Sequence, residues 1–232
     1  MAVQRRDFSG GMKGKNLRYL DEARATPTVH ARAGFLLLEH FSLPAFTQAL
    51  DTIVTANLLR PALFASTTFG LQGGEVTSDL GLVIRPDAPL TLAALKDLDL
   101  LVICGGYRTE LKAGPELVGL LKAAAERGVA LAGLWNGAWF LGIGGLLEGY
   151  RCAIHPEHRP ALAEISRATQ VTSEAFVVDR DRLTPPAQPA PSIWPWSGSR
   201  ACTARRWWRG SKTSCRSRSR ATGASSRPRR CR

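Results

Sequence analysis

The last 49 residues, from Thr184 to Arg232, have a composition that cannot build an ordinary hydrophobic core. They include 12 Lys and Arg, no Asp or Glu, four of the six Trp and one Ile, and they lack Leu, Val, Phe and Met. Residues 1–183 carry 19 basic and 19 acidic side chains, so the formal net charge of +12 belongs entirely to the tail. We therefore expect the folded part of the chain before Thr184.

Three interpretations of residues 184–232 stay open: a disordered basic tail, a nucleic-acid arm, and the product of a shifted reading frame. An arm would place basic side chains on phosphates and stack Trp rings on bases, using Arg205, Arg206, Arg209, Lys212, Trp207 and Trp208. The frameshift hypothesis fits best. With G+C-rich codons, residues 191–201 read from the third base of each codon become V-D-L-A-L-V-G-L-A-G-L, an amphipathic helical pattern.

Residues 31–183 have the length of one domain and can bury a proper core. Residues 1–30 are polar, are punctuated by Gly and lack a signal-peptide core, so we interpret them as a flexible leader. Residues 129–147 carry no charge, but five Gly and one Asn favour a strand, turn and helix over a membrane span. Cys104 and Cys152 are the two cysteines of residues 31–183, and so few cysteines suit a reducing compartment. We expect a single cytoplasmic domain.

Strand-length apolar runs alternate with segments of helical periodicity along this domain. The runs at 32–38, 64–69, 82–84, 98–104 and 129–134 predict strands, and 44–59, 115–127 and 138–147 predict helices. Several strands are apolar on both faces, which is typical of an α/β fold with a mostly parallel sheet. Ligands of such sheets bind at the carboxyl ends of the strands, so the candidate loops are 39–44, 105–108 and 135–137.

The segment Gly133-Leu134-Trp135-Asn136-Gly137 has the strand, tight turn and helix arrangement of a nucleophile elbow. Its central residue is Trp135, and an indole cannot attack a carbonyl. We therefore expect neither acyl-transfer nor thiol chemistry at this turn. Close packing of a helix on the sheet is an alternative explanation for the glycines.

Three segments together resemble the PfpI-like branch of the class I glutamine amidotransferase superfamily: the elbow, the strand that ends in Leu-Val-Ile-Cys-Gly-Gly at Gly106, and residues 145–151 (GLLEGYR). Residues 34–42 (GFLLLEHFS) and 178–184 (VDRDRLT) are similar, more specifically, to the N-terminal effector domain of AraC-type (GlxA-like) transcriptional regulators. The resemblance covers residues 31–184. It implies a flavodoxin-like three-layer sandwich. In the family a pair of helix-turn-helix motifs follows this domain, and we expect this chain to lack them in the given frame.

Two positions depart from the enzymatic relatives. Their elbow Cys is Trp135 here, and their supporting acid aligns near Ala45, which cannot lower a thiol pKa. Glu39 lies about six residues earlier and is not assigned as a catalyst. Cys104 follows a strongly apolar run, so we interpret it as an inert buried residue. We expect no catalytic residue and no cofactor.

The predicted domain can bind a ligand without reacting with it. Backbone N–H groups near the elbow would receive a carboxylate, helped by the N-terminus of the following helix. The Trp135 ring would form a wall and offer a cation–π face to a quaternary or guanidinium group. We interpret His155 and His158 as loop histidines rather than metal ligands. The predicted ligand-binding residues are Phe41, Ser42, Gly105, Gly106, Trp135, Asn136, Gly137 and His155.

The predicted function is a non-catalytic, small-molecule-sensing domain of an AraC-family transcriptional regulator. The resemblance implies an amino acid or betaine-like effector, a homodimer, DNA contact through a missing C-terminal domain, and no membrane partner. One alternative is a PfpI-like enzyme, such as a hydrolase, hydratase or isomerase, which an elbow without Cys disfavours. Another is a dimerisation scaffold whose pocket is occluded by Trp135.

Overall fold

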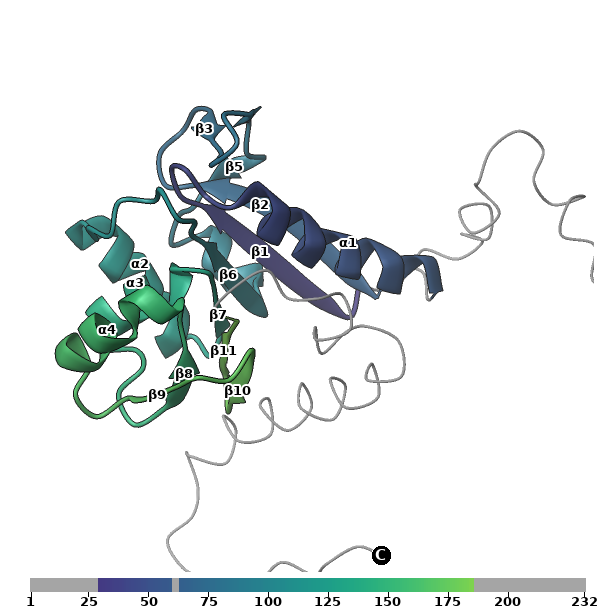
Figure 1. Ribbon diagram of the computed structural model, residues 1–232. Helices are drawn as coiled ribbons and strands as arrows, with labels where there is room; N and C mark the ends of the chain where they lie inside the picture. Colours follow the sequence, from purple (N-terminus) through teal and green to yellow (C-terminus); the bar gives the residue numbers. More distant parts are fainter. Residues whose placement is uncertain (1–28, 60–62, 186–232) are drawn as a thin grey trace, which may run out of the picture.

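The computed structural model of the chain describes residues 29–59 and 63–185 (Figure 1). The described residues form a seven-stranded sheet of order β10-β11-β7-β6-β1-β2-β5. Its strands are β1 (Ala31–Leu37), β2 (Phe64–Gly70), β5 (Ala88–Pro89), β6 (Leu100–Cys104), β7 (Ala130–Leu134), β10 (Val177–Asp179) and β11 (Arg182–Thr184). Neighbouring strands are parallel except for the β10–β11 pair. The expected mostly parallel sheet is confirmed.

Alternating side chains of the central strands supply two separate cores. Leu101 and Ile103 of β6 enter one core, and Val102 between them enters the other. Helices α2 (Pro115–Glu126) and α3 (Gly137–Ile143) contribute to the first core, and α1 (Leu43–Leu59) contributes to the second (Figure 1). Helices therefore cover both faces of the sheet, which confirms the flavodoxin-like three-layer sandwich.

The long periodic segments form the elements that their patterns predict, within a few residues. Helix α2 begins at Pro115 and is followed by Gly128 in a left-handed conformation, φ 76°. Helix α3 ends at Ile143, four residues before the predicted end, because Gly144 and Gly145 follow and Gly145 has φ 70°. None of the helices among the described residues is long and apolar enough to cross a membrane.

The strand predicted at 82–84 is confirmed, but it lies outside the seven-stranded sheet. Strand β4 (Val83–Ile84) pairs antiparallel with β3 (Val76–Thr77) in a separate two-stranded ribbon. Val83 is 55% exposed, so this run is not buried between two layers as the central strands β6 and β7 are. The ribbon packs on the loop after β1, where the Asp79 carboxylate accepts a hydrogen bond from Leu43 N at the start of α1.

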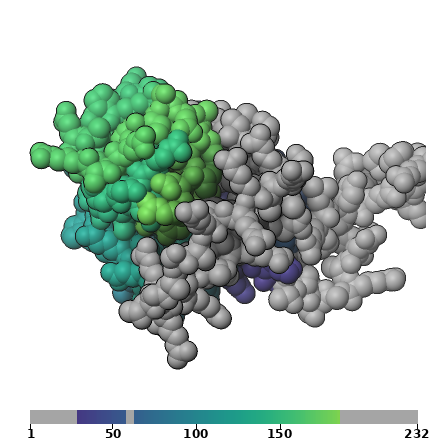
Figure 2. All heavy atoms as spheres, turned by 90° about the horizontal axis from the view of Figure 1, so that it is seen from below, coloured from purple at the N-terminus to yellow at the C-terminus, as the bar shows by residue number. Residues whose placement is uncertain are grey.

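The last part of the described chain contains elements too short for a periodic signal. These are the paired strands β8 (Arg151–Ala153) and β9 (Gln170–Thr172), helix α4 (Arg159–Ile165) and the 3-10 turn η2 (Pro156–His158); another short 3-10 turn, η1 (Ala94–Asp97), precedes β6. The space-filling view places these later residues on one side of the molecule, away from strand β1 (Figure 2).

Strand β11 ends one residue after Leu183, the expected end of the domain. Thr184 is the last residue of β11 and is fully buried, and its Oγ1 accepts a hydrogen bond from Ala153 N at 2.9 Å. The expected leader, except residues 29 and 30, and the tail after Pro185 lie outside the described residues.

Candidate functional site

The loops that follow β1, β6 and β7 pack directly on one another. Ser42 N donates a hydrogen bond to Gly105 O at 3.0 Å, and Asn136 Nδ2 donates one to Gly106 O at 3.2 Å. A Cβ atom on Gly106 would lie 2.5 Å from the carbonyl oxygen of His40, so this approach requires glycine. The structure thus brings together the three loops predicted to form the crevice.

Trp135 occupies a strained backbone position between β7 and α3. Its φ of 55° lies in the left-handed region, which bulky residues rarely adopt. The flanking glycines permit the turn, since a Cβ on Gly133 would lie 2.3 Å from Ala138 N and one on Gly137 would lie 2.2 Å from Ile103 O. The elbow interpretation and the close-packing explanation of the glycines therefore describe the same turn.

The Trp135 indole stacks on the imidazole of His155, which lies between β8 and η2. The ring centroids are 4.9 Å apart and the ring planes differ by 7°. Trp135 Nε1 is buried and has no hydrogen-bond partner in the part of the chain that the structure describes. A buried unpaired donor costs about 1–3 kcal/mol, so an acceptor supplied by a ligand would be stabilising here.

Two more unpaired polar atoms lie beside the elbow. The Gly106 carbonyl accepts hydrogen bonds from Thr109 N and Asn136 Nδ2, each at 3.2 Å. Thr109 Oγ1 and Asn136 Oδ1 are buried and without a partner among residues 29–59 and 63–185. Thr109 was not predicted, because it lies in a polar loop that has no recognisable motif.

Some predicted ligand-binding groups are engaged within the protein. Phe41 is fully buried and packs edge-on against Phe46, with ring centroids 5.7 Å apart. Gly105 N donates to Leu134 O at 3.3 Å, so it does not offer a free donor. The polar atoms beside the elbow that have no partner among the described residues belong to Trp135, Asn136 and Thr109.

The described residues near the elbow do not form a pair of thiol and supporting acid. Cys104 is fully buried, its Sγ donates to Val102 O at 3.8 Å, and burial raises the pKa of its thiol. The Glu39 carboxylate accepts a hydrogen bond from Thr77 N, and Ala45 is buried on α1. This environment agrees with the interpretation of Cys104 as an inert core residue.

Two histidines and a glutamate converge beside Trp135. One ligand atom each of His155, Glu157 and His158 lies within 4.8 Å of the other two. Trp139 packs against His158 at 6.2 Å between ring centroids. Trp139 lies in the first turn of α3 and was not predicted as a site residue.

We predict that the protonation of His158 makes stability depend on pH. Burial lowers the pKa of His158 below its ordinary value of 6.5; the nearby His155 lowers it further and Glu157 opposes the shift. Since the unfolded chain binds the proton more readily, stability is lost as the pH falls through 6.5 toward the folded-state pKa. Urea midpoints measured between about pH 7.5 and pH 5 should fall less for His158→Gln than for the native chain. An equal fall in both proteins would contradict the prediction.

Comparison with known proteins agrees with this arrangement. A model of the DJ-1/PfpI family matches residues 41–192, which include the elbow and His155. The chain belongs to the DJ-1/PfpI family. The resemblance stated from the sequence is confirmed, and the relatives that the comparisons find in this family include AraC-type regulators.

The curated relatives are transcriptional regulators longer than the matched region. The chain is 34% identical over 159 residues to the HTH-type transcriptional regulator GbdR of Pseudomonas aeruginosa, covering 68% of this chain and 43% of that protein. It is 33% identical over 150 residues to the HTH-type transcriptional regulator CdhR of the same species, covering 65% and 44%. The chain thus spans less than half the length of these regulators.

Solved structures agree in fold. An AraC family transcriptional regulator from Pseudomonas putida shares 47% identity and a TM-score of 0.67, over 80% of this chain and 99% of that chain. A ThiJ/PfpI family protein from Pseudomonas syringae shares 20% identity and a TM-score of 0.64, over 84% and 83%. The second likeness shows the common fold alone.

Proposed function

We propose that residues 31–185 form the non-catalytic, small-molecule-sensing domain of an AraC-type transcriptional regulator. The observation that carries the proposal is Trp135, a strained residue at the sheet's carboxyl edge whose buried N–H has no partner among the described residues. Strain of this kind persists where the surrounding structure holds it, and it is common at ligand-binding sites. An indole at this point can recognise a ligand but cannot attack one.

The proposed effector is a small carboxylate that also carries nitrogen, such as an amino acid or a betaine. Its carboxylate would accept the hydrogen bond of Trp135 Nε1, and its donor groups would reach Thr109 Oγ1 and Asn136 Oδ1. A quaternary ammonium has no donor, so its recognition would depend on an aromatic face. His155 stacks on one face of the Trp135 indole, so this contact would use the opposite face.

DNA binding and dimerisation belong to the whole regulator in this proposal. The curated relatives are named HTH-type regulators, and the chain spans less than half of their length. This supports a DNA-binding domain outside the matched region. The hypothesis that residues 184–232 are out of frame, and that this chain lacks such a domain, concerns a segment that lies outside the described residues except for Thr184 and Pro185.

Replacing Trp135 by Phe tests the effector site. The Phe ring can still stack on His155, but the Nε1 donor is removed. Isothermal titration with glycine betaine and with L-arginine as probes should show binding to the native chain. The Phe variant should bind about tenfold more weakly, which corresponds to the loss of one net hydrogen bond.

Trp139→Phe is the matched control for this experiment. Trp139 Nε1 already donates to Leu111 O at 2.8 Å, so its loss should reduce stability and leave ligand affinity unchanged. Equal weakening by the two substitutions would show that the Trp135 N–H does not contact the ligand. Binding of neither probe, nor of any common amino acid, would contradict the proposed effector class.

The stack of Trp135 on His155 also supports a second candidate, the occluded dimerisation scaffold. In that case the indole fills the crevice permanently and no small molecule raises the melting temperature, although a ligand of the native state must do so. Sedimentation velocity would still show a dimer. The enzyme alternative is disfavoured, because Cys104 lies in the core with a raised pKa and cannot supply a thiolate.

A further inference from the structure

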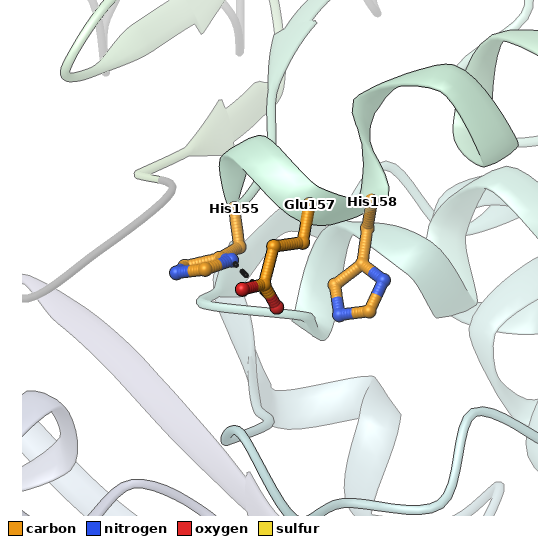
Figure 3. A group of neighbouring side chains, drawn as sticks. All are labelled: His155, Glu157 and His158. Carbon is orange, nitrogen blue, oxygen red and sulfur yellow. Dashed lines mark ion pairs between the residues drawn. The ribbon is translucent and has the colours of Figure 1, made fainter.

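We propose that His155, Glu157 and His158 bind a late first-row divalent metal ion, with Zn²⁺ as the representative, at the edge of the crevice. The Glu157 carboxylate lies between the two imidazole rings (Figure 3). One ligand atom from each residue lies within 4.8 Å of the other two. The donor atoms of the proposed site differ from the effector contacts Trp135 Nε1 and Thr109 Oγ1, and the proposal goes beyond the function proposed above.

The chemistry of the three donors selects the class of ion. Two imidazole nitrogens and one carboxylate oxygen suit zinc and its neighbours, whereas calcium and magnesium prefer sites made of oxygen atoms alone. Three protein ligands leave at least one coordination position for water or an exogenous group. The set therefore resembles an open metal site more than a closed structural one.

The unpaired state of His155 favours a metal over a simple ion pair. His155 Nδ1 is buried and has no hydrogen-bond partner within the described residues. Its separation from Glu157 Oε2 is 3.9 Å, which is too long for a hydrogen bond. Two atoms bound tetrahedrally to one zinc ion lie roughly 3.4 Å apart. An ion between these two atoms therefore requires their separation to shorten by about 0.5 Å.

The surroundings hold the two rings and leave the carboxylate free to adjust. His155 is fixed by its stack on Trp135, and His158 packs against Trp139. Both tryptophans come from the turn and first residues of α3, so the rings rest on a rigid element of the fold. The Glu157 side chain is 61% exposed and can rotate toward the ion. Two ligands held in position by packing and a third that can rotate are sufficient to coordinate the ion.

Titration with Zn²⁺ tests the proposal on the full-length chain. Cys202, Cys215 and Cys231 could bind zinc independently, so all three are replaced by Ser in the reference protein. Isothermal titration calorimetry should show one equivalent of Zn²⁺ bound, and no comparable binding of Mg²⁺. Glu157→Gln and His158→Gln should each weaken binding by at least the roughly 10–100-fold that loss of an outer-shell partner costs.

His30→Gln is the matched control, because His30 is an exposed histidine on another part of the domain. It should bind Zn²⁺ as tightly as the reference protein. Far-UV circular dichroism establishes that each variant is folded, and His155→Gln provides a third substitution if one of the other two fails. The proposal is overturned if the reference protein does not bind Zn²⁺, or if the Glu157 and His158 variants bind it as well as His30→Gln does.

Discussion

Replacing Gly137 by Ala is expected to lower the free energy of unfolding by about 3 kcal/mol or more. A Cβ at this position would lie 2.2 Å from Ile103 O and 3.2 Å from Ile103 C, both of them backbone atoms of the central strand β6. Neither a rotamer change nor a flexible side chain can relieve that overlap. Either α3 moves away from the sheet or β6 shifts, and Trp135 loses its position in both cases. Urea unfolding followed by far-UV circular dichroism measures the change.

Gly119→Ala provides the control for this substitution. Gly119 lies within α2, and a Cβ added there would meet no atom within 4 Å. Because glycine is unfavourable in a helix interior, this variant should be stabilised by about 0.5–1 kcal/mol. If Gly137→Ala lowers the free energy of unfolding and Gly119→Ala raises it, the loss at Gly137 comes from steric overlap and not from the removal of a glycine in general. Similar stability of the two variants would show that α3 is not held tightly against β6.

Replacing Arg182 by Ala is expected to cost about 3 kcal/mol, because a largely buried charge network would lose its cation. Arg182 is 4% exposed and lies in β11. Its Nε donates to Leu146 O at 2.9 Å, its Nη1 donates to Asp181 O at 3.2 Å, and it pairs with the Asp181 carboxylate at 3.0 Å. Its guanidinium also lies 4.9 Å from the centre of the Tyr150 ring. The loss would leave the Leu146 carbonyl and the Asp181 carboxylate without this cation. Thermal and urea unfolding both measure the change.

Lys112→Ala removes the cation of an exposed pair for comparison. Lys112 Nζ lies 2.7 Å from Glu110 Oε1, and both side chains are largely in solvent. Exposed pairs contribute little, so no measurable loss of stability is expected. If Arg182→Ala were as stable as Lys112→Ala, strand β11 would not belong to the cooperatively folded domain. The comparison therefore also tests where the folded part of the chain ends relative to the basic tail.

Sequence reasoning predicted the part of the site that depends on local sequence patterns. Glycines at 133 and 137 and apolar runs before each loop predict a tight turn at the carboxyl edge of a parallel sheet. Trp135 at the centre of that turn is visible without coordinates, and so is the exclusion of a nucleophile there. Phe41 was predicted to touch ligand, and its ring is buried against Phe46 in the core. Whether an aromatic residue in a loop points inward depends on the elements around it.

The amino-acid sequence by itself determined the layers of this protein, because two-sided apolar strands alternate with amphipathic segments, and these periodicities are local properties of the chain. It also places Trp135, whose indole is not a nucleophile, at the centre of the turn. Only the tertiary structure decided which distant residues meet. The stack of His155 on Trp135 and the convergence of His155, Glu157 and His158 depend on how β8 and η2 pack beside α3. Short elements of this kind carry too few residues for a periodic signal, so their positions follow from packing against the whole sheet.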